Sequence, residues 1–199
     1  MRVPPIQSAI HVIHEEHDLL QAIIHGMLHL VHDIANGKPV PDLKIFRAML
    51  FYIKEYPDKV HHPKENRYLF ALLRKRSNQL DATIAELESQ HIQGDSLVAE
   101  MEHALARYEL SGTPTFRQFH DMVERYAAFY RNHMRIEENE ILPAAMKILT
   151  PDDWSVINDA FSSNTDPRGD AGQKPELQKL FSLIVNIAPP PVGVGPAVS

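Results

Sequence analysis

Four long segments of the chain carry apolar residues at alternating steps of three and four, the spacing that places side chains on one face of an α-helix. The clearest of these stripes runs through residues 78–110. Its members are Leu80, Ile84, Leu87, His91, Gly94, Val98, Met101, Leu105 and Tyr108. A stripe this long predicts a helix that buries one face against other helices, with a histidine in the middle of that face.

The other three segments are residues 6–35, 42–76 and 114–149. Asn36 and Gly37 end the first of them, and Pro114 suits the first turn of the last. Short connections make successive helices antiparallel neighbours. The sequence therefore predicts an all-α protein built as an up-down-up-down four-helix bundle. We expect Pro57 and Pro63 to kink or break the second helix and Pro143 to bend the end of the fourth, because proline lacks the amide donor.

The chain is predicted to divide into a bundle over residues 1–150, two short helices packed on it over residues 151–188, and a tail over residues 189–199. Thr150 followed by Pro151 and two acids is typical of a helix start, and this helix should run to about Ser163. A last helix is expected from Pro175 to Ile187. The tail is rich in proline and glycine, which predicts disorder.

Each of the four stripes contains a histidine, and two of them contain a glutamate four residues after it. These polar residues are His17, His61, Glu65, His91, His133 and Glu137. A spacing of four places both members of a pair on one face, one turn apart. A buried carboxylate is costly without a compensating charge, and no lysine or arginine lies in the stripes. Bound cations would supply that charge, so the pattern predicts a metal site.

A single histidine in a helix core more often bonds to the backbone than to a metal. Four of them, one per helix, together with two glutamates, favour the metal site. The remaining histidines lie mostly off the stripes and are predicted to face solvent or to support the site from outside. They are His11, His14, His25, His29, His32, His103 and His120. His62 should point about 100° away from His61 around the helix, beside the ligands rather than among them.

Composition excludes several other classes of protein. The chain has 199 residues and no cysteine, which excludes disulfides, thiolate nucleophiles and cysteine-ligated metal sites. A net charge of −6 argues against a nucleic-acid partner. No apolar leader and no apolar run of about 18 residues is present, so no membrane association is predicted and a cytoplasmic location is expected.

Ferritin-like di-iron bundles are the main structural alternative. Their signature is Glu-x-x-His on two different helices, with two further glutamates. This chain has Glu88-x-x-His91 and Glu100-x-x-His103, but both pairs fall on the same predicted helix. The ligand set is also richer in histidine than in carboxylate, so this alternative is rejected.

The sequence resembles the hemerythrins and the wider group of HHE cation-binding domains. The matching segments, in chain order, are HEEHDLL at 14–20, HHPKEN at 61–66, ELESQH at 86–91 and NHMRIEENEILP at 132–143. The resemblance implies two irons with an oxo or hydroxo bridge. It implies His17, His61, His91 and His133 as terminal ligands, and Glu65 and Glu137 as bridges. Glu138 is a weaker candidate for the second bridge. Asp95 stands where the oxygen-carrying members have a further histidine, which puts reversible oxygen carriage in doubt.

Two histidines per iron, the two carboxylates and the oxygen bridge would leave one octahedral position open on each iron. The resemblance therefore implies binding of O2, NO or a reactive oxygen or nitrogen species, for sensing or stress protection. Two alternatives stay open at this point. One is an enzyme that reduces peroxide or NO or repairs iron centres, and the other is iron storage. Gly94, three residues after His91, either allows close helix packing or leaves a pocket beside one iron.

Overall fold

A computed structural model of the chain describes residues 4–162 and 173–198, and within these ranges it contains helices and no strand. The α-helices are α1 (Pro5–Ala35), α2 (Lys44–Tyr56), α3 (His62–Lys64), α4 (Ala71–Arg76), α5 (Asp81–Ser111), α6 (Thr113–Ile136), α7 (Leu142–Ile148), α8 (Pro151–Ser162) and α9 (Gln173–Ile187). Three π-helical segments lie between them, at Pro57–His61, Glu65–Phe70 and Glu137–Ile141.

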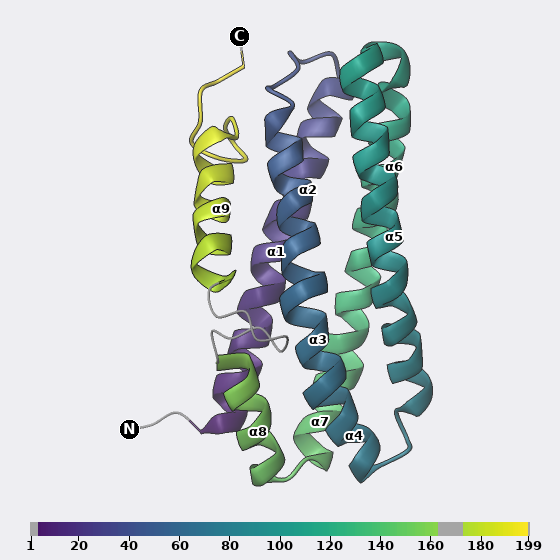
Figure 1. Ribbon diagram of the computed structural model, residues 1–199, viewed down its shortest axis with the longest axis vertical. Coiled ribbons are helices and arrows are strands. Elements are labelled where there is room, and N and C mark those ends of the chain that lie inside the picture. The colour runs from purple at the N-terminus through teal and green to yellow at the C-terminus, as the bar shows by residue number, and fades with distance from the viewer. Residues whose placement is uncertain (1–3, 163–172, 199) are drawn as a thin grey trace.

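The predicted four-helix bundle is confirmed. Four long helical columns lie side by side, with successive columns joined at opposite ends of the molecule (Figure 1). The first column is α1 and the third is α5. The second runs through α2, α3 and α4, and the fourth through α6 and α7.

The prolines alter the second and fourth columns as expected, but through π-helical turns and not through breaks. Pro57 opens the segment Pro57–His61, Pro63 lies in α3, and Pro143 lies in the first turn of α7. A proline ring clashes with the carbonyl one turn earlier, and a wider turn is one way for the helix to continue past such a position. Each glutamate of the predicted site begins one of the π-helical segments.

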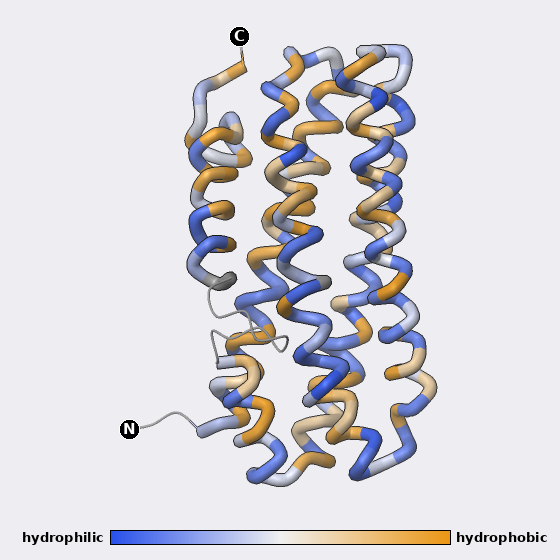
Figure 2. Tube along the Cα trace, viewed as in Figure 1, coloured by the Kyte–Doolittle hydropathy of each residue, from blue (hydrophilic) through white to orange (hydrophobic). Residues whose placement is uncertain are grey.

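The hydrophobic core consists of two clusters, one on each side of the polar residues. Along α1, Ile13 belongs to one cluster and Leu20 to the other, with His17 between them. Along α5, His91 likewise separates Leu87 from Leu97. Hydrophobic and hydrophilic residues alternate along every long helix, as a bundle with one buried face per helix requires (Figure 2). The polar residues are therefore held inside a well-packed core.

The last two helices cover the side of the bundle near α1 and α2 (Figure 1). Helix α8 contacts α1 and adds buried Trp154, Ile157 and Phe161 to the core, while α9 contacts α2. The predicted start of α8 is confirmed, because the Asp153 carboxylate accepts from the amide and the hydroxyl of Thr150. That carboxylate also pairs with Arg76, which holds the pKa of Asp153 well below its usual range.

The C-terminal tail differs from the predicted disorder over residues 189–198, where the structure gives it a defined path. It turns after Pro189 and folds back, and the Val194 amide donates to the carbonyl of Val185 over 2.8 Å. A Cβ at Gly193 would lie 2.3 Å from that same carbonyl oxygen, so glycine permits the close approach. Composition alone did not reveal these contacts. No described helix is long and apolar enough to cross a membrane.

Gly94 is buried on α5, and packing against the neighbouring helix does not require glycine at this position. A Cβ placed there would lie 3.6 Å from a ring carbon of Phe129 on α6, which is ordinary contact. We expect Gly94→Ala to raise the free energy of unfolding by about 1 kcal/mol, because alanine is the better helix former and no atom has to move. Urea denaturation measures this change. A decrease in stability would show that the two helices pack too closely for a side chain, whereas weaker azide binding to the iron-loaded variant would support a pocket at this position.

Candidate metal centre

The structure brings the six polar residues of the stripes together in the middle of the bundle. His17 comes from α1 and His91 from α5, while the other four come from the second and fourth columns around the π-helical turns. All six are buried, with exposed fractions between 1% and 6%. They are His17, His61, Glu65, His91, His133 and Glu137.

One half of the cluster consists of His17 and His61. Their Nε2 atoms face each other over 3.1 Å. The Oε2 atom of Glu137 lies 3.2 Å from Nε2 of His17, and Oε1 of Glu65 lies 3.3 Å from Nε2 of His61. Two nitrogens and two oxygens therefore surround one point.

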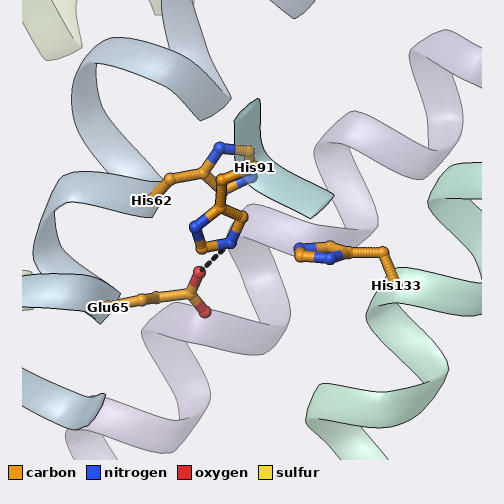
Figure 3. A group of neighbouring side chains, drawn as sticks. All are labelled: His62, Glu65, His91 and His133. Carbon is orange, nitrogen blue, oxygen red and sulfur yellow. Dashed lines mark ion pairs between the residues drawn. The ribbon is translucent and has the colours of Figure 1, made fainter. Parts of the chain in front are cut away.

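The other half consists of His91 and His133. Oε1 of Glu137 lies 3.1 Å from Nε2 of His133, and Oε2 of Glu65 lies 3.5 Å from Nε2 of His91. Figure 3 shows the pair formed by His91 and Glu65, with His133 pointing toward them from the opposite side. Each glutamate thus presents one oxygen to each half, which is the arrangement of a carboxylate shared between two cations.

The donor set fits a metal on two physical grounds. Nε2 of His133, both oxygens of Glu137 and Oε2 of Glu65 are buried without a hydrogen-bond partner among the described residues, although such groups normally have one. In addition, ligands bound at about 2.1 Å and at right angles lie about 3.0 Å apart. Several of the separations above, at 3.1–3.3 Å, are close to that value.

Three of the histidines are oriented by groups outside the cluster. Nδ1–H of His61 donates to Glu16 and Nδ1–H of His17 donates to Glu138, each over 2.8 Å. Nδ1–H of His133 donates to the side-chain oxygen of Gln90 over 3.0 Å. Such acceptors select the tautomer that leaves Nε2 free for a metal. The spacing of residues along the chain does not reveal these roles, although Glu16 and Gln90 directly precede two of the predicted ligands.

The chain matches a known protein family over most of its helical bundle. The family model of the hemerythrin HHE cation-binding domain matches residues 8–145, which include every residue of the cluster. The chain belongs to this family. A search of curated proteins found no match to the chain. The hemerythrin domain binds cations as a family, and its buried histidines and glutamates in this chain form groups that suit a metal ion.

The pKa shifts of the buried residues show which charges a bound cation would replace in the hemerythrin domain. Burial would lower the pKa of His17, but Glu137 and Glu138 outweigh it and raise that pKa to about 9. Burial acts on His61 in the same direction, and Glu65 and Glu16 raise its pKa well above the usual range. Burial would raise the pKa of Glu137, yet His133 and His17 hold it well below the usual range. Without metal, protons on the histidines therefore compensate the buried carboxylates.

Metal binding should consequently release protons. Because His17 and His61 both have raised pKa values, we expect iron loading at pH 7 to release about two protons per chain. The His17 contribution to metal-free stability is fully present below about pH 6.5 and is lost as the pH rises through about 9. The stabilisation by iron should therefore increase across that interval. Calorimetry in buffers of different ionisation enthalpy counts the protons, and release of none at pH 7 would contradict these charge states.

His62 is buried beside the cluster, where its ring stacks on His91 with centroids 3.9 Å apart and planes 11° apart (Figure 3). Its Nε2 is hydrogen-bonded to the Tyr130 hydroxyl over 3.1 Å. One ligand atom of His62 lies within 4.8 Å of ligand atoms of Glu65, His91 and His133, so by distance alone His62 could be a metal ligand. However, the lone pair of a ring nitrogen lies in the ring plane, so two stacked rings cannot both direct one at the same metal. His62 therefore supports His91, and burial together with His91 holds its pKa well below the usual range.

Two substitutions of His62 would distinguish a side chain that only packs against His91 from one that binds the metal. His62→Phe keeps a ring stacked on His91, whereas His62→Ala leaves a cavity there. We expect His62→Ala to weaken iron binding by about 10–100-fold, as the loss of groups that orient ligands does. The phenylalanine variant should stay within a few-fold of the parent in a competition assay with a chelator. Equal losses in both variants would show that the ring nitrogen of His62 matters, which would contradict a role limited to stacking on His91.

The structure also shows where the residues lie whose roles the sequence did not decide. Glu138 contacts the outer nitrogen of His17 and is 36% exposed, so it lies outside the cluster, whereas Glu137 lies within it. Asp95 is exposed on α5 and does not take the place of the further histidine of oxygen carriers. His11, His14, His25 and His103 are exposed, as expected.

Proposed function

We propose that this hemerythrin domain holds two irons, one between His17 and His61 and the other between His91 and His133. Glu65 and Glu137 would bridge them, as the sequence predicted. The observation that carries the proposal is the position of the two glutamates, each of which presents one oxygen to each histidine pair. Burial of all six side chains supports it, because two carboxylates in a core require compensating charge.

We further propose that the centre binds O2, NO or a reactive oxygen or nitrogen species, for sensing or stress protection. When bound, iron would supply a coordination position that a diatomic molecule or peroxide can take. The protein contributes apolar surroundings, since hydrophobic clusters lie on both sides of the site. It also contributes fixed ligand orientations through Glu16, Gln90 and Glu138. A cytoplasmic location and the absence of a nucleic-acid partner remain predictions from the sequence.

Stopped-flow spectra of the iron-loaded, reduced protein mixed with O2, NO or H2O2 test this function. A stable spectral change with one of them is the expected result. Continuous consumption of the added molecule would show an enzyme, and no reaction with any of them would show iron storage. Both outcomes contradict the proposal. The Glu137→Gln chain is the control, since its spectra should not change.

A further inference from the structure

A second group of possible metal ligands lies on the surface of the bundle, away from the core cluster. It consists of His32 near the end of α1 and of His120 and Glu124 on α6. One ligand atom from each of the three lies within 4.8 Å of the others. His32 follows His17 by roughly 20 Å along α1 at the usual rise per residue, so the group is separate from the core cluster.

The local geometry resembles that of a metal half-site. His120 and Glu124 are four residues apart and therefore share a face of α6, as His133 and Glu137 do. Nε2 of His32 on α1 contacts the carboxylate of Glu124 on the neighbouring helix α6. Two imidazoles and one carboxylate from two helices are thus brought together, with side chains 23–48% exposed so that water can complete the coordination.

His120 is also oriented from outside the group. Its Nδ1 is hydrogen-bonded to the carboxylate of Asp121 over 3.1 Å, and its ring packs 6.0 Å from that of Phe116. An acceptor at Nδ1 leaves Nε2 as the nitrogen available to a metal, which is the role of carboxylates behind metal-bound histidines.

We propose that His32, His120 and Glu124 form a surface site for a divalent transition metal of the zinc type. Imidazole suits zinc, copper and nickel. Magnesium and calcium require several oxygen ligands, and this group supplies only one carboxylate. Two histidines, one glutamate and a water complete a four-coordinate zinc shell. A metal there would link the end of α1 to α6. The site does not depend on what the core cluster binds.

Titration of the iron-loaded chain with ZnCl2 by calorimetry tests the site, with iron release followed in the same sample. We expect the parent to bind one more zinc per chain than His120→Ala. Glu124→Gln, at a half-exposed position, should weaken this binding at least tenfold. Asp121→Asn should weaken it about tenfold, as the loss of an orienting carboxylate does. His103→Ala, which removes an exposed histidine on α5, is the matched control and should bind like the parent.

The difference between the parent and His120→Ala counts the surface site whatever the core holds, so failure of the proposed iron centre would not obscure it. Circular dichroism checks that each variant folds. Equal zinc stoichiometry and affinity in the parent, His120→Ala and Glu124→Gln would overturn the proposal. Zinc taken up only in exchange for iron, or heat with MgCl2 equal to that with ZnCl2, would overturn it as well.

Discussion

Glu137→Gln should produce a folded chain that no longer holds two irons. Glutamine keeps the shape of the side chain but removes the charge that faces both histidine pairs, through Oε2 toward His17 and Oε1 toward His133. We expect the iron content after desalting to fall from about two per chain to one or less, a figure that follows from counting ligands. Antiferromagnetic coupling between the irons should disappear from the magnetic susceptibility.

Glu138→Gln is the matched control for this substitution, because the two residues are adjacent and Glu138 contacts Nδ1 of His14 and of His17, outside the cluster. It should keep both irons and their coupling, with weaker binding at most. The reverse outcome, with coupling lost in Glu138→Gln and kept in Glu137→Gln, would show that the bridge is assigned to the wrong glutamate. Glu65→Gln should behave like Glu137→Gln, since it also reaches both halves.

Iron should stabilise the fold strongly. A ligand present at 1,000 times its dissociation constant adds about 4.1 kcal/mol to the free energy of unfolding. For a chain of this size, each kcal/mol raises Tm by about 2–4 °C, so loading should raise it by about 8–16 °C. Buried oxygens of Glu65 and Glu137, which lack hydrogen-bond partners among the described residues, would be coordinated by the metal. Differential scanning calorimetry of loaded and metal-free protein measures the shift.

The matched comparison for this prediction is the Glu137→Gln chain under the same conditions, which should show a small shift or none. A loaded parent that melts at the temperature of the metal-free protein would mean that iron does not enter the core. An equal shift in the Glu137→Gln chain would place the stabilising metal elsewhere.

The fold could be predicted from the sequence because the apolar stripes are long and regular. The stripe through Leu87, Val98 and Leu105 identifies a buried helical face without ambiguity, and α5 buries all three residues. Part of the site could be predicted in the same way, because His17 and His91 interrupt such apolar faces. A polar residue in an otherwise apolar stripe is a strong indication of a functional site, because burying a polar group costs free energy unless it is compensated.

Other features of the site and the tail depend on contacts between different parts of the chain, which the spacing of residues along one helix does not reveal. An ideal helix turns His62 away from His61, whereas the π-helical segment that ends at His61 changes the turn and both rings are buried. Gln90 and Glu138 reach their histidines across different columns, so no spacing along one helix identifies them. The tail after Pro189 is held by contacts with α9 that its proline-rich composition hides.

The number and coupling of the bound metals test the central claim most directly. The chain would be reconstituted with Fe²⁺ without oxygen, and its metal content determined by elemental analysis together with Mössbauer spectra. We predict about two irons per chain, because the six side chains would give each iron two histidines of its own and a share of both glutamates. Reproducible binding of a single metal, or of zinc alone in tetrahedral geometry, would contradict the account.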